Sequence, residues 1–419
     1  MATMESIEGK SETPVEQLPN VSPLDKIIVA VAGPLFSFLL ALVFAVVVWQ
    51  VGKPSNEADG TTTVGWVEPA GPAAKAGLRA GDTILEVDGQ PVHHFAPTSA
   101  DSVTWRIVTS TGTNIAIKFL RDGKENTVYA VPIHLATHWY ERKSLRKIIV
   151  VPASKATIGE VASNSPAALA GLKVGDEVVA LDGKKIYHPQ SVMDSEAGMS
   201  NGIVRPLVLT IRRGTEQFDK TVLAVKPTLE TSPPTFFQKI CYGLHLAKQI
   251  PLPSPHPLLG VTVWIGDTNV LLVHPSPWEQ IQVSGSQIFS TFGALFNKKG
   301  EIGVQQLGGA VMIARVYSNL FQDEDGWRRV LWFSVILNVN LALLNMLPLP
   351  VLDGGHITLS LIEWIRRRPV HAKFLEWIQT GFAALLITFM IYIAFFDAGD
   401  WFRSALADRE VNVVFAAPK

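Results

Sequence analysis

Three apolar stretches of this chain contain no charged residue: Ile27–Gly52, Val330–Leu352 and Trp377–Phe396. Each is long enough to cross a bilayer, because a membrane helix needs about 20 predominantly apolar residues. The sequence has 47% hydrophobic and only 17% charged residues, as expected for membrane helices joined to water-soluble insertions. A net charge of −1 gives no reason to expect nucleic acid binding, and the single Cys241 excludes an internal disulfide.

The second apolar stretch ends in an unusual polar sequence, Asn345-Met-Leu-Pro-Leu-Pro-Val-Leu-Asp353-Gly-Gly-His356. A carboxylate at the mouth of a membrane helix is costly without compensation, so Asp353 marks a candidate functional site. Pro348 and Pro350 lack backbone N–H groups and favour a non-helical segment. The alternative is a helix that simply ends at the two prolines, with Asp353 capping the next segment.

An internal repeat lies between the first two apolar stretches. Val67 opens the sequence VEPAGPAAKAGLRAGD, and Val161 opens VASNSPAALAGLKVGD 94 residues later. Each copy continues into a short apolar strand and an Asp-Gly turn, at Asp88-Gly89 and Asp182-Gly183. The repeat spacing is typical of one small domain per copy.

This repeated pattern is similar to the core of bacterial PDZ domains, which are α+β domains. In PDZ domains an extended peptide adds a strand to an exposed sheet edge. We expect these edges near Val64 and Gly65 in the first copy and near Ile158 and Gly159 in the second. The expected ligands are extracytoplasmic peptide termini; the alternative is a domain with a closed groove that acts as a steric plug.

The pattern NxxPxPxLDGG, formed by Asn345, Pro348, Pro350, Asp353 and the two following glycines, resembles the second signature of the site-2 protease family of intramembrane zinc metalloproteases. The resemblance extends to the bacterial branch that regulates sigma factors and carries tandem PDZ domains. It implies that Asp353 is a Zn²⁺ ligand and that Asn345, Pro348 and Pro350 bind an unwound substrate segment. The implied substrates are single-span membrane proteins such as anti-sigma factors, with the PDZ domains gating access.

The first signature of that family, HExxH on a membrane helix, does not occur in this sequence. The nearest approach is His134-Leu-Ala-Thr-His138, which has a leucine in place of the general base and for which a polar strand end is the favoured interpretation. His356 is interpreted as a packing residue rather than a ligand. We therefore expect a chain truncated at its N-terminus that contains no catalytic residue and is inactive alone.

The predicted fold is a multi-pass α-helical membrane protein with about three transmembrane helices and two inserted PDZ domains. Positive charge at Arg366–Lys373 predicts a cytoplasmic loop, which places Asp353 on the cytoplasmic side of an inner membrane and the PDZ domains outside. The expected parts are a polar loop (1–24), a membrane helix (25–52), PDZ domains (60–136 and 150–228), a linker with a strand and an amphipathic helix (229–327), a membrane helix with the motif (328–356), a C-terminal membrane helix (374–397) and a tail (398–419).

Two other functions remain open. The absence of HExxH favours a non-catalytic membrane adaptor or pseudoprotease that binds peptides through its PDZ domains. A transporter with Asp353 on a polar path is disfavoured, because three spans show no inverted repeat.

Overall fold

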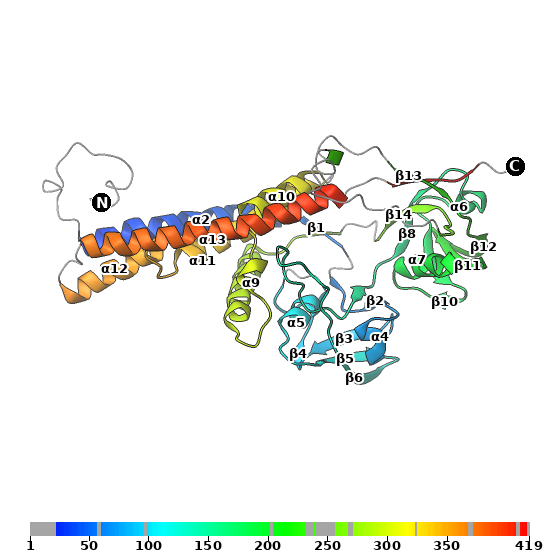
Figure 1. Cartoon of the computed structure of the whole chain (residues 1–419), viewed down its shortest axis with the longest axis horizontal. Coiled ribbons are helices and arrows are strands. Elements are labelled where there is room, and N and C mark those ends of the chain that lie inside the picture. The colour runs from blue at the N-terminus through cyan, green and yellow to red at the C-terminus, as the bar shows by residue number, and fades with distance from the viewer. Residues whose placement is uncertain are drawn as a thin grey trace. The chain divides into compact units, whose positions relative to one another are not determined.

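The computed structural model describes residues 22–56, 60–95, 99–201, 204–231, 238–239, 256–266, 271–322, 325–367, 372–407 and 411–416. It divides into two compact units (Figure 1). The first unit contains the apolar helices, and the second contains the β-sheets.

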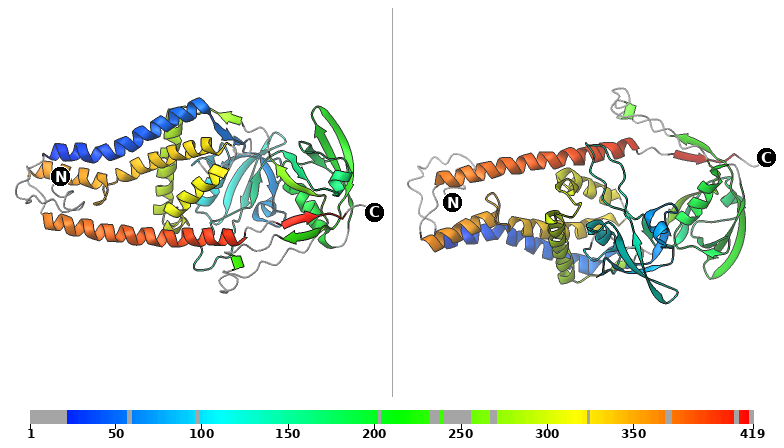
Figure 2. Two further views of the ribbon diagram at one scale, coloured as in Figure 1. Left: turned by 90° about the horizontal axis from the view of Figure 1, so that it is seen from above. Right: turned by 60° about the horizontal axis from the view of Figure 1, so that its bottom comes forward.

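The first unit is helical. Its helices are α2 (Pro23–Val51), most of α9 (Pro277–Phe296), α10 (Ala310–Gln322), α11 (Gly326–Asn345), α12 (Asp353–Arg366) and most of α13 (Ala372–Ala407). Figure 2 shows α11 and α12 alongside α2, while α9 crosses their direction. Short strands β1 (Lys53–Ser55) and β15 (Leu271–Val273) pair with each other.

Helix α2 shows why this unit suits a bilayer. Ser22 caps its first turn, and Pro34 lies within it. Its buried positions are mostly small residues, which let neighbouring helices approach closely, whereas large apolar side chains such as Phe36 are exposed, as on a lipid-facing surface. Among the described residues, three helices are long and apolar enough to cross a membrane: Pro23–Val51, Gly326–Asn345 and Lys373–Leu406. The prediction of about three such helices combined with β-rich insertions is confirmed at this level.

The second unit contains two main antiparallel sheets. The first has the order β4-β3-β5-β6 and is accompanied by a β2-β7 pair; the second has the order β12-β11-β9-β8-β14, with β10 paired to β9. In the first domain the elements are β2 (Val64–Val67), α4 (Pro72–Ala76), β3 (Thr83–Val87), β4 (Gln90–Pro91), α5 (Val103–Thr109), β5 (Ile115–Arg121), β6 (Lys124–Ala130) and β7 (Val150–Pro152). In the second they are β8 (Ala156–Val161), α6 (Pro166–Leu169), β9 (Glu177–Leu181), β10 (Lys184–Lys185), α7 (Gln190–Ala197), η2 (Gly198–Asn201), β11 (Pro206–Arg213), β12 (Glu216–Leu223) and β14 (Val261–Ile265). The remaining elements are β13 (Thr228–Thr231), which pairs with β16 (Val411–Val414), and the turn η3 (Val304–Gln306).

The two sequence copies share their element order, and each has its own buried apolar core. The predicted Asp-Gly turns are confirmed: Asp88 and Gly89 both have positive φ between β3 and β4, as do Asp182 and Gly183 between β9 and β10. Positive φ at both central residues matches the twist of a tight hairpin, which is why Asp-Gly recurs there.

The Gly-Asp that closes each repeat motif also has a structural role. Asp82 is almost fully buried and pairs with Arg121 at 2.6 Å, and Asp176 is equally buried and pairs with Arg213 at 2.6 Å. Each carboxylate also accepts a backbone N–H from three residues earlier in the chain. These ion pairs, in each of which the carboxylate is buried and the arginine is partly exposed, join the motif to the end of the long hairpin in both domains.

Candidate active site in the helical unit

The loop between α11 and α12 carries most of the residues singled out in the sequence. Helix α11 ends at Asn345, and residues 346–352 are not helical. Leu349 donates its backbone N–H to Leu347 O at 2.7 Å, and Leu352 donates to Leu349 O at 3.0 Å, so the loop is a succession of tight turns. Pro348 and Pro350 contribute no donors to it. The segment predicted to contain one membrane helix, 328–356, is therefore interrupted at the motif.

The two glycines of the motif let this loop fold back over the start of α12. A Cβ atom at Gly354 would overlap the carbonyl oxygens of Met346 and Leu347, and one at Gly355 would overlap that of Leu349. Both glycines are buried in the first turn of α12. Any larger residue would push the loop away from Asp353.

Asp353 begins α12 and faces α2. A Cβ atom built on Gly33 would lie 2.7 Å from Asp353 Oδ2 and 3.5 Å from its Cγ, closer than real Cβ atoms approach an oxygen. Gly33 therefore makes room for the carboxylate beside the backbone of α2. A Gly-Pro pair in a membrane helix, here Gly33-Pro34, suggests a bend or a close neighbour. The structure identifies this neighbour as Asp353.

The predicted site residues are brought together by chain connectivity and by this contact. Asn345, Pro350, Asp353 and His356 are half-buried, and Pro348 is exposed. In the described part of the chain, neither the Asp353 carboxylate nor the Asn345 amide has a hydrogen-bonding partner, so both groups are available to a ligand. A second link between the same two helices, Lys26 Nζ to Glu363 Oε2 at 2.8 Å, was not anticipated from the sequence.

The donor set does not fit a zinc ion by itself. Zinc sites use three or four nitrogen, sulfur or carboxylate ligands. Nowhere among the described residues do three His, Cys, Asp or Glu side chains gather to hold a metal. His356 is three residues from Asp353 on α12, which gives at most two donors there. The zinc expected from the family resemblance would need ligands beyond these.

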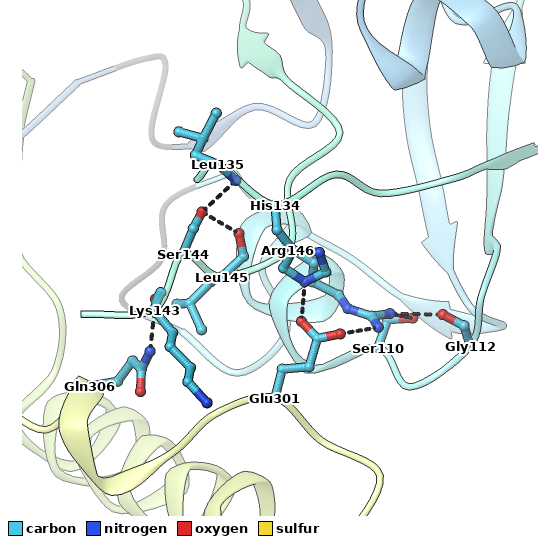
Figure 3. Close-up of polar contacts among 10 residues, drawn as sticks. All are labelled: Ser110, Gly112, His134, Leu135, Lys143, Ser144, Leu145, Arg146, Glu301 and Gln306. Carbon is cyan, nitrogen blue, oxygen red and sulfur yellow. Dashed lines mark hydrogen bonds and ion pairs between the residues drawn. The ribbon is translucent and has the colours of Figure 1, made fainter. Parts of the chain in front are cut away.

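The histidines of His134-Leu-Ala-Thr-His138 are engaged elsewhere. His134 Nε2 lies 2.5 Å from Glu301 Oε2 (Figure 3), and the His138 ring stacks on Tyr140 with centroids 5.2 Å apart. Arg146 also binds Glu301 at 2.7 Å, and this hydrogen bond is the main cause of a lowered pKa for the Glu301 carboxyl. His134 thus belongs to a polar network with Arg146 and Glu301, and His138 belongs to an aromatic pair; neither is part of a metal-binding group among the described residues.

The predicted peptide-binding strands are not free sheet edges in the structure. Val64 pairs with Pro152 of β7, and on its other side it exchanges backbone hydrogen bonds with Gly81 and Asp82. Strand β8, which contains Ile158 and Gly159, pairs with β9 and β14. Strand β14 comes about 100 residues after β8 in the chain, so no local pattern revealed this pairing.

Among the described residues, β14 is instead the last strand of the second sheet. Its residues are Val-Thr-Val-Trp-Ile, with Val263 and Ile265 exposed, whereas the opposite edge strand, β12, carries several charged residues. Charged residues on an edge discourage strand addition, and an apolar edge permits it. Sequence reasoning identified the β14 strand but missed its position at the edge.

The loop before β14 is held by a buried carboxyl group that sequence reasoning also missed. Leu259 donates its backbone N–H to Glu196 Oε1 of α7 at 2.7 Å. Glu196 is only 7% exposed, and burial raises its pKa to about 7 despite the opposing effect of this hydrogen bond. Glu196 therefore couples α7 to the loop that leads into the edge strand.

Comparisons with known proteins cover nearly the whole chain. The model of Peptidase family M50 matches residues 2–389. A provisionally assigned zinc metalloprotease of Neisseria meningitidis is 27% identical over 90% of this chain and 79% of its own length. Protease RseP of Yersinia pestis is 24% identical over the same shares. The regulator of sigma E protease of Haemophilus influenzae is 23% identical over 93% of this chain and 83% of its own length.

Proposed function

Because the chain belongs to peptidase family M50, the site-2 protease family, we propose that it acts in regulated intramembrane proteolysis of single-span membrane proteins such as anti-sigma factors. The observation that carries the proposal is the non-helical loop at 346–352, which lies between two helices of an apolar unit and ends at Asp353. Peptide hydrolysis requires an unwound substrate backbone, and a non-helical loop holds backbone groups outside the regular helical hydrogen-bonding pattern. The relatives named for sigma E regulation support this substrate class.

Each motif residue has a distinct role in this proposal. Asn345 can both donate to and accept from a substrate peptide group without burying a charge. Pro348 and Pro350 keep the loop non-helical. Asp353, held beside Gly33, is the zinc ligand that the family resemblance implies.

Under this proposal Asp353 is one zinc ligand of several, and the HExxH that would supply further ligands and the general base does not occur in the sequence. The sequence contains no HExxH, and the described structure gathers no metal-binding set. We therefore propose that a polypeptide of this sequence cleaves nothing on its own. No catalytic step is assigned to its residues.

The two sheet domains are proposed to be PDZ domains on the extracytoplasmic side that gate substrates. The shared element order of the two repeats supports this assignment, and the positive charge of Arg366 and Arg367 at the C-terminal end of α12 supports this orientation. The apolar edge strand β14 supports strand addition by an extended peptide terminus in the second domain. This edge replaces the one expected from the sequence.

An alternative function is a non-catalytic adaptor that uses only the sheet domains, and the missing HExxH favours it. The two functions differ in where a membrane substrate makes contact. A protease site requires contact at the loop 346–352, whereas an adaptor requires contact only at the sheet edge.

Site-specific photocrosslinking separates these possibilities without requiring activity. A photoreactive residue at Met346, which is 47% exposed in the loop, is expected to capture a co-expressed single-span substrate. The matched control is Leu361 on α12, which is 42% exposed and apolar. Capture from Val263 of β14 alone would contradict the protease proposal and support the adaptor.

A second experiment addresses Asp353 directly in the membranes of the protein's own cells. Asp353→Asn keeps the size of the side chain but removes its charge, and it is expected to abolish both bound zinc and substrate cleavage. Gly33→Ala keeps the aspartate in the sequence, but the added methyl group displaces its carboxylate from α2. This variant is expected to weaken both zinc binding and substrate cleavage. Unchanged cleavage in both variants would refute the role of Asp353.

A further inference from the structure

A closed loop projects from the first sheet domain between Ile133 and Lys147. Its ends are joined by two backbone hydrogen bonds, Ile133 N to Lys147 O at 2.9 Å and Lys147 N to Ile133 O at 3.0 Å. Closer to the tip of the loop, Leu135 donates its N–H to Ser144 Oγ at 3.1 Å. We refer to residues 133–147 as the aromatic loop, after Trp139 and Tyr140 at its tip.

The base of the aromatic loop is fixed to the domain by a polar network (Figure 3). The nearly buried Arg146 donates to Gly112 O at 2.8 Å and to Glu301 at 2.7 Å, and Glu301 also contacts His134. Gln306 donates to the carbonyl oxygen of Lys143 at 3.0 Å. With both sides of the loop held in this way, its tip has a defined position in the second unit.

The tip consists of two aromatic residues. Glu141 donates its N–H to His138 O at 3.0 Å, and His138 donates its N–H to the Glu141 carboxylate at 2.9 Å, which closes a turn with Trp139 and Tyr140 at its centre. The two rings pack edge to face, 5.6 Å apart. Trp139 is 87% exposed, although large aromatic side chains are usually well buried. A rigid loop therefore presents an uncovered indole ring.

The tip is also tied to the end of α13. Arg142 Nε lies 2.8 Å from Asp400 Oδ2, Arg403 Nε lies 3.8 Å from Glu141 Oε1, and Arg403 also pairs with Asp400. Asp400 and Arg403 belong to α13, just beyond the charge-free stretch that ends at Phe396. If α13 crosses the membrane, these two residues mark the level at which it emerges into water.

We propose that the aromatic loop is an interfacial anchor that inserts Trp139 and Tyr140 into the headgroup region of the bilayer beside the C-terminal end of α13. Trp and Tyr are enriched at this level because their rings are amphipathic. The exposed Lys143 adds a positive charge that favours anionic headgroups. The anchor rests on α13 being a membrane helix, not on proteolytic activity.

Spin labels on the full chain in nanodiscs of phosphatidylethanolamine and phosphatidylglycerol test the anchor. Cys241→Ser provides a background for single-cysteine variants, with Trp139→Cys at the tip and Leu169→Cys as control, because Leu169 is apolar and 64% exposed on the second domain. We compare how often the spin label collides with dissolved oxygen and how often it collides with a water-soluble nickel chelate. The ratio of the first frequency to the second is expected to be several-fold higher at position 139 than at position 169. Equal ratios at the two positions would overturn the proposal.

A second variant tests the tie to α13. Asp400→Asn removes the charge that holds Arg142 and Arg403 and is expected to lower the collision ratio at position 139 toward that of the control. A high ratio that survives this change would show that the loop meets lipid without the ion pairs, and would overturn the assigned tie. Photocrosslinking at Met346 is independent of both results, so failure of the anchor is distinguishable from failure of the proposed protease site.

Discussion

Replacing Glu196 with glutamine tests how the second sheet domain holds its edge strand. Burial raises the folded pKa of Glu196 to about 7, against an ordinary value of 4.5. The folded state thus binds this proton more tightly than the unfolded chain does. The contribution of this bound proton to the free energy of unfolding is fully present below pH 4.5. It is lost as the pH rises through 7 and the buried carboxyl group ionises.

The size of the effect follows from the shift in pKa. A difference of about 2.5 pKa units corresponds to about 3 kcal/mol at full ionisation, as an order of magnitude. Glutamine cannot ionise, yet its carbonyl oxygen can still accept the Leu259 N–H. We therefore expect Glu196→Gln to stabilise the domain by about 3 kcal/mol at pH 8 and by less than about 1 kcal/mol at pH 5.

The measurement is hydrogen exchange by mass spectrometry on peptides of β8, β9 and β14, in the full chain at pH 5 and pH 8 after correction for the intrinsic exchange rate. Glu216→Gln on the exposed edge strand β12 is the matched control, because a solvated carboxylate pays no burial cost. If Glu196→Gln changes the amide protection relative to the wild type by the same amount at pH 5 and at pH 8, the assignment of a buried, ionising Glu196 is refuted. The same assignment is refuted if the wild-type domain becomes more stable at pH 8.

Three further substitutions have expected outcomes. Asp176→Ala removes the ion-pair partner of Arg213 and leaves the Lys173 N–H without its acceptor, and it is expected to cost about 1–3 kcal/mol, measured by denaturant unfolding of the second domain. Burial alone would raise the pKa of Asp176, but the hydrogen bonds from Arg213 and Lys173 lower it, so the wild-type pair is expected to weaken as the pH falls through that lowered value. Gly260 has φ +92°, and in Gly260→Ala the new Cβ would overlap Ser165, so this variant is expected to release β14, measured as lost amide protection. Gly214→Ala is the control: its φ is also positive but its Cβ meets open space, so it should cost only about 1 kcal/mol. Asp397→Ala removes the acceptor for Gly309 N–H (2.9 Å) and Met312 N–H (3.1 Å) and is expected to cost α10 about 1–2 kcal/mol, measured as faster exchange in its first turn.

Features governed by neighbouring residues were predictable from the sequence. The three charge-free stretches indicated the membrane-length helices, and the Asp-Gly pairs indicated hairpin turns in which both residues have positive φ. The two prolines indicated the break after Asn345. Helix, turn and span propensities depend on residues a few positions apart, so one sequence suffices to reveal them.

Features that depend on distant segments were predicted only in part. The sequence suggested a close neighbour for Gly33 but did not identify Asp353, which lies more than 300 residues later. It indicated a strand near Val261 but assigned the free edge to β8. No local pattern in the sequence indicates that Glu196 is buried, because a single glutamate in a short helix is usually solvated.

The sequence by itself determined the class of protein: the apolar stretches, the repeated domain pattern and the NxxPxPxLDGG motif are all local in the chain. Only the tertiary structure decided which strand is an edge, which carboxyl group is buried, which glycine admits Asp353 and which aromatic tip stands beside the end of α13. The physical reason is that pairing and burial are properties of contacts between remote segments. A residue's burial, and with it the pKa of a group such as Glu196, is established only when those segments have packed.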